Sequence, residues 1–173
     1  MAQRIRRLKI DPSALVYTRT IYFDTIENYC RGTKMTRDEL ESQLGSDGFT
    51  VLRGDSPPLV LYNANAPVCR RAFTLAHEVG HICLGHRDDN PENEAQANLF
   101  AANLLMPRIL LFELKRRYGH ISAGYICRVF TASRQAAELQ MRQTADEFSA
   151  LERELLRAYA GLLSSPGEPE LGF

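Results

Sequence analysis

The feature that most constrains this chain is the sequence H-E-x-x-H at residues 77–81, which stands in an apolar run that predicts a helix. Because an α-helix has about 3.6 residues per turn, His77 and His81 lie on one face and can hold one metal ion between them. Glu78 lies beside that face, from which it can act on water at the metal without being a ligand, as a zinc-dependent hydrolase requires. The alternative is a chance match by two ordinary histidines, but burying unpaired polar groups costs roughly 2 kcal/mol or more each, which favours a metal.

A second helix is expected soon after the first, over residues 91–105, with Asn90 as its N-cap and Pro91 in its first turn. A third protein ligand is expected from this helix, because catalytic zinc usually has three and leaves one position to water. Its several alanines keep it thin, so that it can approach the first helix and bring a Glu carboxylate to the metal. Glu94 and Asn98 lie one turn apart and share a face.

Three blocks of the chain resemble the ImmA/IrrE family of metallopeptidases. They read R-A-F-T-L-A-H-E-V-G-H at residues 71–81, E-A-Q-A-N-L-F-A-A at residues 94–102 and L-L-M-P at residues 104–107. Their order and separation make the resemblance far more specific than H-E-x-x-H alone, and it extends roughly from Leu59 to Arg142. The resemblance implies a zincin-like metallopeptidase core that binds one zinc per chain.

The same resemblance assigns roles to individual residues. It implies three zinc ligands and one catalytic acid/base, which are His77, His81, Glu94 and, as the acid/base, Glu78. Glu92 is a rival for the third ligand, but Glu94 is the one that stands four residues before Asn98, as the family pattern has it. Asn98 can then orient the Glu94 carboxylate, with an ordinary surface Asn as the alternative.

The sequence does not choose the group that stabilises the tetrahedral oxyanion. The candidates are Arg71, His86, Tyr118, His120 and Tyr125. His86 follows Gly85 and stands five residues after His81, so it is expected off the ligand face, and a role at the helix end or behind a ligand is an alternative to catalysis. Gly80 permits close backbone approach near the metal, at a helix cost of ~1 kcal/mol relative to Ala.

The stretch before the motif predicts two helices and two strands. One helix is expected from residue 11 to residue 27 or 30, ended by Gly32, and a shorter one starts with a Thr36–Glu39 capping box and stops at Gly45. Residues 49–52 and 59–62 predict adjacent antiparallel strands. The fold class is therefore α+β, mainly helical with a small antiparallel sheet. An edge strand of this sheet can pair with an extended substrate beside the metal, or the sheet can simply pack against the helices.

The length of 173 residues, with 45% hydrophobic and 24% charged residues, predicts one ordinary domain with a small appended module. The metallopeptidase core is expected over residues 1–107, with a flexible N-terminus at residues 1–10. A helical module packed on the core is expected over residues 108–163, followed by a flexible tail at residues 164–173.

Residues 122–142 in this module have the outline of a helix-turn-helix, with a helix, a tight turn and a second helix capped by Ser133. Such a pair can read DNA, hold a protein partner or serve helical packing alone. Lys plus Arg and Asp plus Glu are equal at 21 each, so no overall charge attracts nucleic acid or membrane. We therefore expect no membrane partner and no direct nucleic-acid binding.

The four cysteines are scattered and form no C-x-x-C pair; they are Cys30, Cys69, Cys83 and Cys127. With no signal peptide and no apolar run of bilayer length, they predict free thiols in a reducing cytoplasm.

The resemblance implies a protein substrate, a cytoplasmic helix-turn-helix repressor whose cleavage switches on mobile-element or stress genes. Two other classes stay open. One is a metal-binding adaptor that holds its partner without cutting it, and the other is a DNA-binding regulator that uses residues 122–142.

Overall fold

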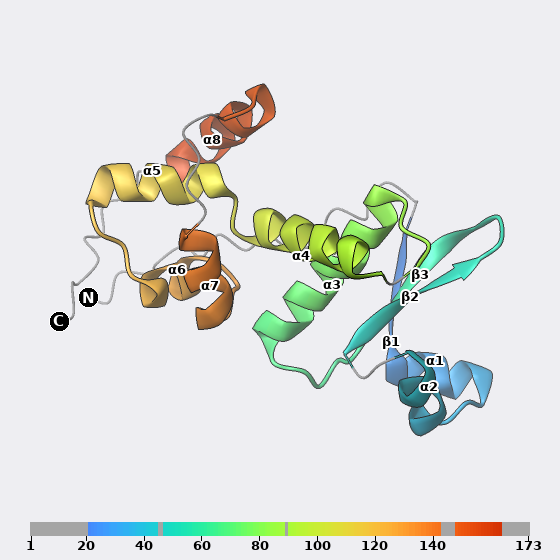
Figure 1. The fold of residues 1–173 in the computed structure, drawn as a ribbon. Helices are drawn as coiled ribbons and strands as arrows, with labels where there is room; N and C mark the ends of the chain where they lie inside the picture. The colour runs from blue at the N-terminus through green and yellow to red at the C-terminus, as the bar shows by residue number, and fades with distance from the viewer. Residues whose placement is uncertain (1–20, 45–46, 89, 143–147, 164–173) are drawn as a thin grey trace. The chain divides into compact units, whose positions relative to one another are not determined.

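The computed structural model describes residues 21–44, 47–88, 90–142 and 148–163 (Figure 1). The chain divides into two compact units, so that the described residues up to Leu105 belong to one and those from Met106 to the other. Helices dominate, and the described residues include one small sheet, which confirms the mainly helical α+β class. The expected flexible ends at residues 1–10 and 164–173, and the helix stop at Gly45, lie outside the described residues.

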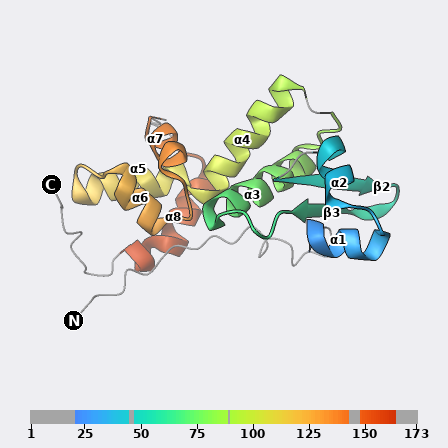
Figure 2. The same cartoon turned by 90° about the horizontal axis from the view of Figure 1, so that it is seen from below.

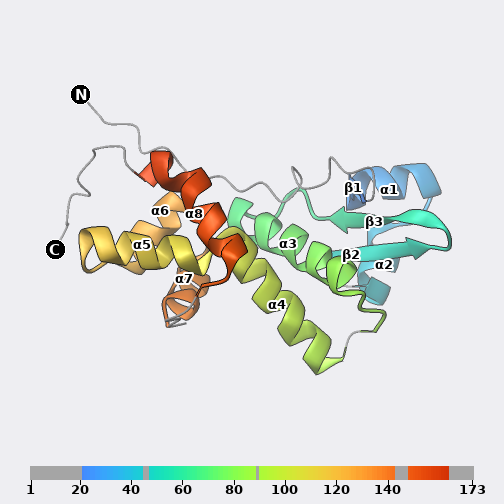
Figure 3. The same cartoon turned by 90° about the horizontal axis from the view of Figure 1, so that it is seen from above.

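The sheet of the first unit has three strands in the order β1-β3-β2. β2 (Gly48–Arg53) and β3 (Ser56–Tyr62) form the predicted antiparallel pair, which is visible as a hairpin in Figure 3. β1 (Tyr22–Thr25) pairs with the other side of β3 in the parallel sense. The sheet is therefore mixed, and the prediction of a purely antiparallel sheet was wrong because it lacked β1. β2 is left as an edge strand among the described residues.

The helix expected from residue 11 to residue 27 or 30 was wrong in the part that the structure describes. Residues Tyr22–Thr25 form β1, and α1 (Ile26–Thr33) begins only after Thr25, whose hydroxyl caps it. Aromatic and β-branched residues suit a strand, and pairing with β3 supplies the partner that local periodicity does not reveal. The helix also runs past Gly32 and ends at Thr33, and the next residue, Lys34, has a left-handed φ of 61°.

α2 (Arg37–Leu44) begins with the predicted capping box. The Thr36 hydroxyl accepts the Glu39 N–H at 3.3 Å, and the Glu39 carboxylate accepts the Thr36 N–H at 2.8 Å. α1, α2 and one face of the sheet enclose an apolar cluster formed by Ile26, Leu40, Phe49, Leu59 and Leu61. Because side chains alternate along a strand, Thr50 lies on the opposite face of the sheet from Phe49.

α3 (Val68–Leu84) contacts both the sheet and α4 (Pro91–Leu105) (Figure 3). α4 starts as predicted, because the Asn90 side chain accepts the N–H groups of its first turn. Ala97 and Ala101 are fully buried, and a Cβ added to Gly80 would lie 3.3 Å from the Cα of Ala97. The small residues therefore allow the two helix backbones to approach closely, as the sequence predicts.

The second unit is built from helices, which are α5 (Arg108–Tyr118), α6 (Ala123–Val129), α7 (Arg134–Met141) and α8 (Ala150–Leu163). α6 and α7 lie next to each other (Figure 2), and each is capped by a serine, Ser122 and Ser133. The helix-turn-helix interpretation of this pair stays a prediction. Among the described residues no helix alone is long and apolar enough to span a membrane; α4 and α5 meet that criterion only when taken together.

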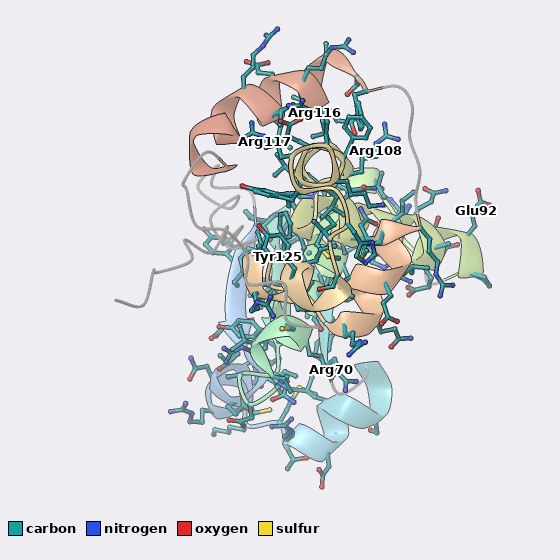
Figure 4. All side chains as sticks on the ribbon, turned by 90° about the vertical axis from the view of Figure 1, so that its left-hand side faces the viewer. Arg70, Glu92, Arg108, Arg116, Arg117 and Tyr125 are labelled. Atoms are coloured by element: carbon teal, nitrogen blue, oxygen red, sulfur yellow. The ribbon has the colours of Figure 1, made fainter. Side chains whose placement is uncertain are left out.

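A buried carboxylate in α5 is held by two neighbouring arginines. Glu113 is 5% exposed, and its oxygens accept from Arg116 at 2.7 Å and Arg117 at 2.5 Å. Figure 4 labels the two arginines. These hydrogen bonds, that of Arg116 first, lower the pKa of Glu113 to about 2 although burial opposes the shift. In the same unit Arg108 pairs with Glu152 at 2.5 Å, and this hydrogen bond lowers the pKa of Glu152 to about 2.

Candidate metal centre

Three side chains from α3 and α4 converge on one point of the first unit. The Nε2 atoms of His77 and His81 are 2.9 Å apart, and the Glu94 carboxylate lies 3.4 Å from the first and 3.2 Å from the second. These separations are close to the ~3.3 Å between ligands that metal distances of about 2.0–2.1 Å give in a tetrahedron. The three groups can therefore hold one metal ion, and two imidazoles with one carboxylate form a donor set used by zinc hydrolases.

Each of the two imidazoles has a hydrogen-bond partner on the side away from the cluster. Nδ1 of His77 lies 3.1 Å from Oδ1 of Asn98, and an amide oxygen only accepts, so this ring carries its hydrogen on Nδ1. Nδ1 of His81 lies 3.2 Å from Nδ1 of His86. Both rings therefore direct Nε2 to the point where the three groups converge, and a metal bound there would take the Nε2 lone pairs.

Glu78 is turned toward the sheet. Its Oε2 accepts a hydrogen bond of 2.7 Å from the hydroxyl of Thr50 in β2. It sits next to His77 on α3 but is not part of the group of converging ligand atoms. The carboxylate is thus fixed between the edge strand and the histidines, where it can take part in proton transfer without binding a metal.

An open cleft of about 880 Å³ runs between β2 and the metal-ligand cluster, that is, His77, His81 and Glu94. Along β2 it is lined by Gly48, Phe49, Thr50, Leu52 and Arg53, and across from them by His77, Glu78, His81, His86, Arg87 and Glu94. The cleft therefore joins the edge strand, Glu78 and the cluster in one concave surface.

The other predicted site residues have different places. Asn98 lies against His77, whereas the sequence interpretation placed it on Glu94. His86 is not in the ligand group but lies directly behind His81. Glu92, the rival ligand, is exposed on α4 (Figure 4), where it accepts from Gln96 at 3.3 Å.

The remaining oxyanion candidates are not brought to the cluster within this unit. The guanidinium of Arg71 donates to the carbonyl of Ala64 at 2.6 Å and so anchors the loop before α3. Tyr118, His120 and Tyr125 belong to the second unit. An oxyanion role for any of them stays a prediction.

Sequence reasoning missed Thr50 and Gln96. Thr50 is far from Glu78 in the chain, and only the pairing of β2 with β3 turns it toward α3. The contact of Gln96 with Glu92 could be predicted from the sequence, because the two residues stand one turn apart on the expected helix. Its contact with His86 could not, because the position of His86 depends on the turn after α3.

The first unit thus carries H-E-x-x-H on a helix beside a cleft, a pattern that metallopeptidases use. A family model described as the IrrE N-terminal-like domain of the M78 peptidases matches residues 35–160. The chain belongs to this family, which confirms the resemblance to ImmA/IrrE metallopeptidases. No curated protein matches the chain.

Proposed function

We propose that this chain is a zinc-dependent endopeptidase. The observation that carries the proposal is the convergence of His77, His81 and Glu94, with ligand atoms 2.9–3.4 Å apart, beside a cleft that also contains Glu78. The donor set fits one Zn²⁺, and family membership supports peptide-bond hydrolysis.

When bound, zinc acts as a Lewis acid that polarises the scissile carbonyl and makes water acidic enough to react near neutral pH. Glu78 accepts a proton from the attacking water and returns it to the leaving nitrogen. The Thr50 hydroxyl donates to one carboxylate oxygen of Glu78 and so orients this carboxylate for the transfer. Asn98 and His86 hold the two imidazoles with Nε2 directed to the cluster.

The substrate is a polypeptide that binds in extended form along β2. Within the described residues one side of β2 pairs with β3, and the strand lines the cleft from Gly48 to Arg53. Its main-chain groups on the other side can pair with a substrate strand and present one peptide bond to Glu78. The sheet also packs against α3, and this packing does not prevent β2 from pairing with a substrate strand.

For the identity of the substrate we propose a cytoplasmic helix-turn-helix repressor, as the family resemblance implies. Cleavage would then relieve repression of mobile-element or stress genes. We propose that residues 1–107 form the peptidase core and that the helical module of residues 108–163 binds this repressor.

The experiment compares wild type with Glu78→Gln and His81→Ala. Elemental mass spectrometry should find about one zinc per chain in wild type and in Glu78→Gln, and little in His81→Ala. Incubation with an extract of the source cells should produce new peptide N-termini with wild type alone. Glu78→Gln that still cleaves would overturn the mechanism, and zinc binding by wild type without cleavage would favour the non-cutting adaptor.

A further inference from the structure

The end of α3 turns back on itself immediately after the metal-ligand helix. Gly85 has a left-handed φ of 73°, and its N–H donates to the carbonyl of Ile82 at 3.2 Å. The N–H of His86 donates to the carbonyl of His81 at 3.0 Å, which closes the turn. This turn returns the His86 ring to His81, with ring centroids 5.1 Å apart, although a continued helix would carry it to another face.

A row of hydrogen bonds continues from His81 through His86 to α4. Nδ1 of His86 lies 3.2 Å from Nδ1 of His81, and its Nε2 lies 3.3 Å from Oε1 of Gln96. Nε2 of Gln96 in turn donates to the carboxylate of Glu92 at 3.3 Å. The row thus links the end of α3 to α4, the helix that also supplies Glu94.

The direction of donation along this row is set from its far end. A carboxylate only accepts, so Glu92 requires the amide nitrogen of Gln96 to face it and the amide oxygen to face His86. His86 then donates from Nε2 and presents a bare Nδ1 to His81. This bare Nδ1 favours hydrogen on Nδ1 of His81, whereas the Glu94 carboxylate, 3.2 Å from Nε2, favours hydrogen on Nε2 when no metal is bound.

We propose that His86 is a positioning residue that fixes the tautomer and ring orientation of His81 for metal binding, with Gln96 and Glu92 setting its own orientation. The inference rests on the proposed metal site. Asn98 has the corresponding positioning role for His77, since its Oδ1 lies 3.1 Å from Nδ1 of that ring. A partner behind an imidazole ligand typically changes metal affinity 10- to 100-fold.

The test uses two substitutions at one position. His86→Phe keeps a ring but removes the acceptor, whereas His86→Asn keeps an acceptor oxygen of the kind that Asn98 gives His77. Zinc affinity is measured by competition with a chelating dye. We expect His86→Phe to bind zinc roughly 10- to 100-fold more weakly and His86→Asn to bind it nearly as wild type does. Gln96→Leu should give a smaller loss in the same direction, and Leu99→Gln, on an exposed residue of the same helix, should give none.

The second readout needs no metal. Long-range ¹H–¹⁵N spectra of the metal-free protein report which ring nitrogen of His81 carries hydrogen. The share of Nδ1–H should be higher in wild type than in His86→Phe and Gln96→Leu, where the Glu94 carboxylate draws the hydrogen to Nε2. Equal zinc affinity of His86→Phe and wild type, or an equal share of Nδ1–H on His81 in the two proteins, would overturn the inference. Wild type that binds no zinc would instead overturn the proposed function, and the tautomer of His81 would still decide the inference.

Discussion

At the scale of single residues, hydrogen bonds from neighbouring side chains set the orientation of the groups in the site. The neighbouring group can often only donate or only accept, so the direction of such a bond is fixed. Thr50 shows this most simply, because its hydroxyl hydrogen is directed to Glu78 at 2.7 Å. A hydrogen bond to a charged group contributes about 1.5–3 kcal/mol. If this hydrogen bond holds the Glu78 carboxylate in the orientation used for proton transfer, removing it should lower the rate of cleavage more than it weakens metal binding.

We therefore expect Thr50→Val to lower kcat/KM for the protein substrate by roughly tenfold or more while zinc content stays at the wild-type level. Thr50→Ser keeps the hydroxyl and should retain most of the rate. Steady-state kinetics with elemental analysis of the same samples checks both. Equal rates for the Val and Ser variants would show that the hydroxyl does not position Glu78.

At the scale of elements, the metal site depends on how closely α4 approaches α3. A Cβ on Gly80 would lie 3.1 Å from Cδ1 of Phe100 and 3.3 Å from Cα of Ala97. The first contact is a side chain, but the second is backbone of α4, so relief requires the helices to separate. Because Glu94 is on α4 and both histidines are on α3, separation also stretches the ligand group.

Gly80→Ala should lower the free energy of unfolding by about 1–3 kcal/mol and weaken zinc binding, because crowding outweighs the helix propensity of Ala. Gly32→Ala is the control. Gly32 is also helical, but a Cβ there meets nothing within 4 Å, so this change should raise stability by up to about 1 kcal/mol. Urea unfolding checks the opposite signs, and a stabilised Gly80→Ala variant would contradict the close-packing account.

At the scale of the whole molecule, the two units respond to different chemical conditions. The first contains the metal-ligand group, and the second contains the carboxylates Glu113 and Glu152, which are held by arginines. Metal therefore bears on the stability of the first unit, and the carboxylates held by arginines make the stability of the second depend on pH.

Removal of zinc by a chelator should increase amide hydrogen exchange in α3 and α4 much more than in α5 to α8. A ligand that binds only the folded state stabilises it by an amount that grows with its concentration over Kd, about 2.7 kcal/mol at 100 times Kd. Exchange measured by mass spectrometry separates the helices. His81→Ala, which should not bind zinc, is the control and should show no response to chelator.

Acid should destabilise the second unit through its paired carboxylates. The pKa of Glu113 and of Glu152 is about 2 in the folded state, against an ordinary value of 4.5. A carboxylate whose pKa is lower in the folded state than in the unfolded state stabilises the folded state above about pH 4.5. This stabilisation is lost as the pH falls toward 2. For the buried Glu113 this contribution is on the order of 1–3 kcal/mol.

Glu113→Gln should remove that contribution at neutral pH and flatten the loss between pH 5 and about 2. Hydrogen exchange in α5 as a function of pH measures it. Glu138→Gln, which breaks the exposed pair with Arg134 in α7, is the matched control and should change little. If α5 in the Glu113 variant kept the full acid response of wild type, the assignment to this carboxylate would be wrong.

Features that depend on residues close together in the chain could be predicted from the sequence. Helical spacing places His77 and His81 on one face, Asn90 and Thr36 cap the helices that follow them, and small residues let α4 approach α3. Such features follow from local periodicity and capping, which act over one or two turns. The three blocks also identified the family, which the match to residues 35–160 confirms.

Only the tertiary structure decided the features that need a distant partner. β1 is a strand because β3 offers it a parallel edge, although its residues were expected to continue a helix. Thr50 meets Glu78 because strand register turns it toward α3, and a one-residue slip would turn it away. His86 meets His81 because Gly85 reverses the chain into a left-handed turn. No local period encodes these contacts, since each is fixed by packing between segments that the chain brings together only on folding.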